Sequence, residues 1–140
     1  MLHANYIAIL AAAIVAWLFG AVYYGVFGKA WVAAQGKTMD MLKVENAGMS
    51  GVRKAAPFLL SFIAEIVMAW ALYGVLTHMS FFTLRQGAIA GALLWFGFVL
   101  TTIAVNNAYT FRSPKLTAID AGHWLGALII IGAIVGAWGA

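Results

Sequence analysis

Three ionisable side chains lie within apolar stretches of the sequence: Glu65, Asp120 and His123. Such groups are costly in hydrocarbon, and by default they mark a functional site such as a proton or ion path. Asp120 and His123 are three residues apart, so on a helix they share a face. A helical rise of about 1.5 Å per residue puts Glu65 about 12 Å beyond Pro57 and His123 about 12 Å beyond Lys115. We therefore expect Glu65 and His123 at similar depth.

Further polar residues fall in the same half of the predicted helices: Asn106, Asn107 and Tyr24. A contact between Glu65 and His123, or between Glu65 and Asn106, would satisfy a buried carboxyl group. We therefore expect Glu65 to be protonated or paired, and to point into the protein.

Two interpretations of these polar residues stay open. They form either a structural network that fixes the register of the helices, or a path for protons, ions or a small solute. A divalent metal ion held by Glu65, Asp120 and His123 is a third interpretation. The single Asp-x-x-His lacks the two Glu-x-x-His pairs of di-iron bundles. We expect no metal and no cofactor.

The composition defines the environment of these residues. The chain has 140 residues, of which 65% are hydrophobic and 9% are charged. In soluble domains about 45–50% of the residues are hydrophobic and about 25% are charged. So few charges cannot cover the surface of a small soluble domain. The absence of cysteine excludes disulfides and thiolate chemistry. No nucleophile, zinc or phosphate-loop motif is present, so we do not expect an enzyme.

Four apolar stretches are each long enough to cross a bilayer, which takes about 20 residues. Each must be helical, because lipid cannot satisfy exposed backbone groups. The predicted fold is an all-α transmembrane four-helix bundle, a single domain over residues 1–140. Its predicted spans are residues 5–27, 57–77, 86–107 and 116–138.

The basic residues predict the orientation. Seven of the eight lie between spans one and two or between spans three and four, and only Arg85 lies on the other side. The positive-inside rule then places both termini outside the cytoplasm of a cell membrane. These charges are topology signals, so we expect no nucleic-acid partner. No basic residue precedes the first stretch, so it is not a cleaved signal peptide.

The segment 28–56 is the large cytoplasmic loop of this prediction. An apolar face over Trp31–Asn46 favours an interfacial amphipathic helix, with an ordinary loop as the alternative. Gly48, Ser50 and Gly51 then interrupt the pattern.

Small residues recur at helical spacing in the first and fourth spans. In membranes such stripes allow close helix contacts, within one chain or between copies. We expect a homo-oligomer, because a bundle this small has little interior room. The third span also opens with two glycines, Gly87 and Gly91. The predicted packing residues are Ala8, Ala12, Ala16, Gly20, Gly122 and Gly126.

The order of aromatic and glycine residues resembles that of domain-of-unknown-function family 1761. The resemblance covers nearly the whole chain and implies a small four-helix integral membrane protein without an assigned activity. It rests on Trp17–Gly20, Tyr23–Trp31, Trp95–Phe98, Asn106, Phe111, Lys115–Leu116, Ile119–Gly122 and Gly136–Trp138.

Two functional classes follow. The first is a structural or regulatory membrane protein in which the polar residues only order the bundle. The second is a small transporter or channel that handles protons, ions or a small solute. The outer half of the spans is almost purely apolar, which favours a cavity open to the cytoplasm over a continuous channel. The expected partners are the lipid bilayer, further copies of the chain and a small ion or solute.

Overall fold

The computed structural model describes residues 4–140, and this part of the chain is helical with short connections. Four helices are long and apolar enough to cross a membrane. The third is continuous but contains a π-helical segment. The first, second and fourth of these helices are α1 (Tyr6–Ala34), α3 (Gly51–Met79) and α6 (Pro114–Trp138). The third consists of α4 (Leu84–Leu94), the π-helical segment η1 (Trp95–Val99) and α5 (Leu100–Tyr109). The predicted all-α transmembrane four-helix fold is confirmed.

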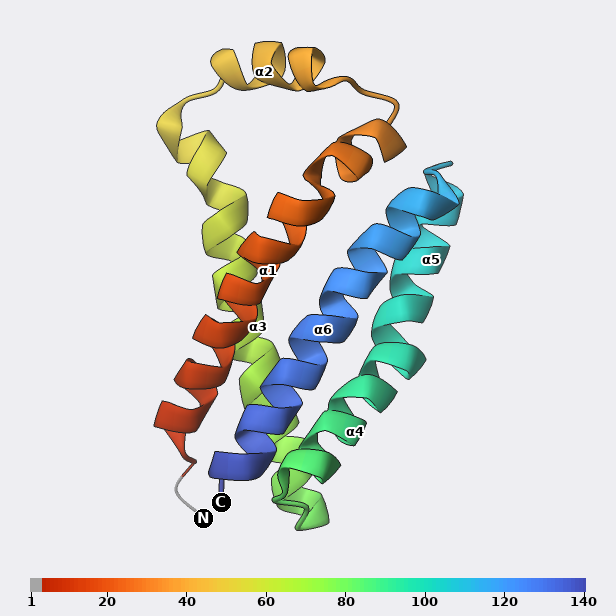
Figure 1. The fold of residues 1–140 in the computed structure, drawn as a ribbon. Coiled ribbons are helices and arrows are strands. Elements are labelled where there is room, and N and C mark those ends of the chain that lie inside the picture. The colour runs from red at the N-terminus through yellow and green to blue at the C-terminus, as the bar shows by residue number, and fades with distance from the viewer. Residues whose placement is uncertain (1–3) are drawn as a thin grey trace.

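The long helices run up and down, and α6 lies between α1 and the third span (Figure 1). The start of α1 and the end of α6 lie at one end of the molecule, where the side-chain amide of Asn5 donates a hydrogen bond to the carbonyl of Trp138 at 2.9 Å. At the other end the short helix α2, Met39–Ala47, crosses between α1 and α3 (Figure 1). The two helices joined by α2 diverge toward it, so the bundle is widest at that end.

The helices begin where a side-chain oxygen can accept a hydrogen bond from a free backbone N–H. Such an N-cap satisfies one of the unpaired donors of the first turn. Pro114 follows its cap at the first position of α6, where a missing N–H does no harm. The capping residues are Asn5, Thr38, Ser50, Thr83 and Ser113.

The segment 28–56 differs from the prediction, because both of its ends belong to the long helices α1 and α3. Trp31 belongs to α1, which ends only at Ala34, where Gly36 takes a left-handed conformation with φ of 74°. Glycine adopts this conformation without steric cost. The predicted helix over Trp31–Asn46 is therefore wrong in its bounds, and only Met39–Ala47 forms α2. Gly51 starts α3 instead of interrupting the chain.

The core consists mainly of small residues of α1, packed against larger apolar residues of α3 and against both small and branched residues of α6. Ala8, Ala12, Ala16 and Gly20 are all buried, and they line one face of α1. Leu72 and Leu76 of α3 complete the centre of the bundle. The stripe of small residues on α1 thus packs within one chain.

Glycines also bring α4 against α6. A Cβ at Gly87 would collide with the backbone of Gly132, and a Cβ at Gly91 would collide with the backbone of Leu128. Only glycine permits two backbones to approach this closely. By contrast, none of the described residues of α5 is buried, so this half of the third span packs loosely against the chain.

Candidate functional site: a cavity between α1 and α3

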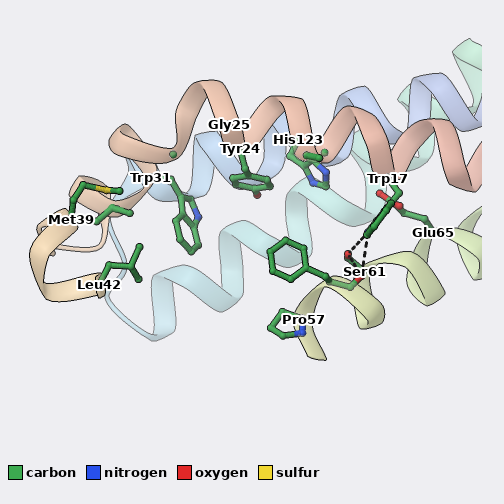
Figure 2. A pocket seen from close by; sticks show the side chains of 15 residues that line it. Trp17, Tyr24, Gly25, Trp31, Met39, Leu42, Pro57, Ser61, Glu65 and His123 are labelled. Carbon is green, nitrogen blue, oxygen red and sulfur yellow. Dashed lines mark hydrogen bonds between the residues drawn. The ribbon is translucent and has the colours of Figure 1, made fainter. Parts of the chain in front are cut away.

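The divergence of α1 and α3 opens a cavity of about 690 Å³ next to α2. This volume is within the usual range of small-molecule pockets, about 300–1,000 Å³. Figure 2 shows side chains of α1 along one wall, Pro57 and Ser61 of α3 opposite, and Met39 and Leu42 of α2 at the end. His123 is the residue of α6 that reaches this cavity.

Three aromatic residues of α1 line the cavity at intervals of seven: Trp17, Tyr24 and Trp31. Seven residues are about two helical turns, so the three rings share one face of α1. Trp17 reaches across to α3, where its Nε1 lies 3.1 Å from both Oγ of Ser61 and the carbonyl oxygen of Phe58 (Figure 2). The indole therefore closes the narrow end of the cavity.

Glu65 lies on the same face of α3 as Phe58 and Ser61, since the three residues are spaced three and four apart. It lines the cavity, and its side chain is 1% exposed. Its Oε2 has no hydrogen-bond partner within residues 4–140. The expected hydrogen bond to His123 or Asn106 is not among those that the described residues form. A buried polar group without a partner is uncommon in folded proteins and needs an explanation.

His123 is the second buried polar residue of the cavity, with 5% exposure. Its ring is surrounded by aromatic rings of α1 and its own helix, with centroid distances of 5.0 Å to Tyr24 and 4.7 Å to Trp124. Its Nδ1 is buried and has no partner among the described residues. Its Nε2 points at the backbone of Gly20, where an added Cβ would lie 2.7 Å away.

Asp120 has a different environment, although it lies one turn from His123 on α6. Its Oδ1 accepts hydrogen bonds from the hydroxyl of Tyr24 at 2.7 Å and from Nε1 of Trp31 at 3.0 Å. Two side chains of the cavity wall are thus oriented by one carboxylate that lies behind them. The described residues bring no three His, Asp or Glu side chains together as a metal site.

The two asparagines are not part of this cavity. Asn107 donates from Nδ2 to Oγ1 of Thr117 at 3.0 Å, a link between α5 and α6. Asn106 is exposed on α5. The prediction placed both with Glu65 because the sequence gives the depth of a residue within its span. The sequence does not give which side of the third span faces the other helices.

The small residues of α6 shape the wall between the cavity and the core. A Cβ at Gly122 would lie 2.7 Å from the hydroxyl of Tyr23, and a Cβ at Gly126 would collide with the ring of Phe19. The Tyr23 hydroxyl itself donates to the carbonyl of Ile119 at 2.7 Å. These glycines make room for aromatic side chains of α1, which is a contact within the chain.

The residues that line the cavity are mostly apolar, and they include an acidic residue but no lysine or arginine. Glu65 is the single acidic residue of the lining. Sequence reasoning missed Trp17, Trp31 and Ser61 as site residues. The seven-residue spacing of Trp17, Tyr24 and Trp31 was the signal that could have found them.

The fold and this cavity define a class: a multi-pass helical membrane protein with a pocket inside its helical bundle. The chain belongs to the family described as protein of unknown function (DUF1761), which matches residues 7–136. No curated protein and no solved structure matches the chain.

Proposed function

We propose that the protein binds a small organic solute within the membrane, in the cavity between α1 and α3. The observation that carries this proposal is the pair of buried, unpartnered polar atoms, Oε2 of Glu65 and Nδ1 of His123, on one apolar cavity. Leaving such an atom unpaired costs about 1–3 kcal/mol. A bound solute with polar groups would supply the missing partners.

The competing structural interpretation applies better to Asp120 than to Glu65. A network that only orders helices has its donors and acceptors paired, as Asp120 does with Tyr24 and Trp31. Glu65 and His123 depart from that pattern at the cavity. We therefore assign the solute-handling role to these two residues and the structural role to Asp120.

The cavity lies at the α2 end, where most basic residues lie, and the positive-inside rule favours the cytoplasm for that end. The proposed protein accepts or releases its solute on the cytoplasmic side, as a binding protein or as the carrier of a transport step. It performs no covalent chemistry on the solute.

Cavity filling tests the proposal directly. A Cβ at Gly25, which lines the cavity, would meet no atom within 4 Å, and the same holds at Gly74 of α3, outside it. A side chain at either position therefore starts in open space, so we expect Gly25→Leu to occupy part of the cavity, and Gly74→Leu is its matched control.

The measurement is saturable binding to purified protein in phosphatidylcholine nanodiscs, with empty nanodiscs subtracted. The probes are tetraphenylphosphonium, tetraphenylborate and uncharged triphenylphosphine oxide. We expect the wild type to bind at least one probe, Gly25→Leu to lose at least tenfold in affinity, and Gly74→Leu to keep it. The proposal is overturned if no probe binds saturably, or if Gly25→Leu binds as the wild type does.

A further inference from the structure

We infer that the cavity selects lipophilic organic cations, with Glu65 as their charge partner. This inference rests on the proposed function and names the chemical class of its solute. It depends on three features of the cavity wall: one buried carboxyl group, no lysine or arginine, and several aromatic rings.

The carboxyl group gives the sign of the charge. A buried carboxylate is stable only when it is paired. In residues 4–140 Glu65 forms no ion pair, and the one salt bridge of this part of the chain joins the exposed Lys37 and Glu45. His123 is neutral or cationic, so it adds no anionic partner to the lining. A cationic solute would pair with the ionised form of Glu65, whereas an anionic solute would be repelled by it and would leave the carboxylate unpaired.

The aromatic rings give the organic character. Trp17, Tyr24, Trp31 and Phe58 line a cavity whose remaining wall is mostly apolar, with Ser61, Glu65 and His123 as its other polar residues. A cation over an aromatic face is attracted to the ring, most strongly over tryptophan, and quaternary ammonium groups are recognised in this way. A hydrated metal ion would gain little from such apolar walls, whereas a cation with apolar substituents fits them.

Asp120 strengthens this preference from behind the wall. Tyr24 and Trp31 both donate to its Oδ1. Hydrogen bonds in a medium of low dielectric polarise their partners, so donation to a carboxylate makes both rings more electron-rich. Asp120 also adds a negative charge next to the edges of both rings, where the Tyr24 hydroxyl and the Trp31 N–H donate to it. Both effects favour a cation at the ring faces.

The test compares two probes of the same shape and opposite charge, in the nanodisc assay already described. We expect the wild type to bind tetraphenylphosphonium at least tenfold more tightly than tetraphenylborate. Glu65→Gln keeps the size of the side chain but cannot carry a charge, and we expect it to lose at least tenfold in affinity for the phosphonium. Asp40→Asn makes the same change on α2 at a residue outside the lining and is expected to bind as the wild type does.

The outcomes separate the two proposals. Binding that is abolished by Gly25→Leu, yet equal for the two charged probes or unaffected by Glu65→Gln, overturns the cation inference and leaves the proposed function standing. Absence of saturable binding for all three probes overturns both. If Glu65→Gln fails to elute and melt as a folded protein, the comparison of the two charged probes on the wild type decides alone.

Discussion

The Nε1 of Trp31 lies 3.0 Å from Oδ1 of Asp120, and this hydrogen bond ties the last turns of α1 to the first turns of α6. The hydroxyl of Tyr24 reaches the same oxygen from one face of α1, at 2.7 Å. One carboxylate thus orients two rings of the cavity wall while α3 diverges on the other side. The α1 wall of the cavity is thus tied to α6, and the opposite wall is the part of α3 from Pro57 to Glu65.

Removing the shared acceptor is expected to loosen that wall. Asp120→Ala leaves the Tyr24 hydroxyl and the Trp31 N–H without their partner; a fully buried unpaired donor costs about 1–3 kcal/mol, and these two partly buried donors should cost less than that each. The variant should unfold at lower temperature in detergent and bind the cavity probes more weakly. Asp40→Ala removes an exposed carboxylate of α2 and should unfold as the wild type does. Equal melting of Asp120→Ala and the wild type would show that this network contributes nothing to stability.

The contact between Gly20 and His123 predicts an asymmetry between two neighbouring glycines of α1. Gly20→Ala puts a Cβ 2.7 Å from Nε2 of His123. The imidazole is held by the surrounding rings and cannot move aside freely, so overpacking should destabilise the protein by about 1–3 kcal/mol. Gly25→Ala meets open space and should be neutral or stabilise by up to about 1 kcal/mol through helix propensity. Thermal unfolding of the two variants in one detergent measures the difference, and equal stability would mean that this contact is not close.

Two glycines of the third span, Gly87 and Gly97, allow a similar comparison, and here we expect a larger loss of stability. A Cβ at Gly87 meets the backbone of Gly132, which cannot turn away as a side chain can. Gly87→Ala should therefore separate α4 from α6 and reduce the yield of folded protein, by a larger margin than Gly20→Ala. Gly97→Ala in η1, where a Cβ meets nothing within 4 Å, serves as the control. Size-exclusion profiles after extraction report both outcomes, and a normal profile for Gly87→Ala would contradict the close packing of the two helices.

The helices could be predicted from sequence because a segment that crosses a membrane must have a minimum length and must be apolar along nearly all of it. The small residues on α1 were also recognisable, since their four-residue spacing survives any arrangement of the bundle. Which helix they contact was not recognisable. They face the interior of the same chain, and Gly20 contacts His123. Helices in lipid use the same small-residue pattern within and between chains.

The cavity was less predictable than the helices, for a geometric reason. Its walls depend on the angle at which α1 and α3 diverge, and no local pattern encodes that angle. Depth placed Glu65 and His123 in one half of the spans, which is where the cavity lies. Depth also suggested Asn106, which faces outward. The π-helical segment Trp95–Val99 could not be predicted, because the sequence around it is uniformly apolar and shows no change of pattern.

The orientation of the bundle is the last prediction. Seven basic residues lie at the α2 end of the chain: Lys29 in the last turns of α1, Lys37 and Lys43 before and within α2, Arg53 and Lys54 in the first turn of α3, Arg112 between α5 and α6, and Lys115 in the first turn of α6. Arg85, near the start of α4, is the basic residue of the opposite end. Cytoplasmic segments retain lysine and arginine during insertion, so the α2 end should face the cytoplasm and both termini the outside.

Reporter fusions measure this orientation. Alkaline phosphatase, which is active only outside the cytoplasm, should be active when fused after Ala140 and inactive when inserted at Gly48 beside α2. A fluorescent protein that matures only in the cytoplasm should give the opposite pattern at the same two sites. Fluorescence from the fusion after Ala140 would reverse the topology. The cavity would then open to the outside, and the solute would be taken from there.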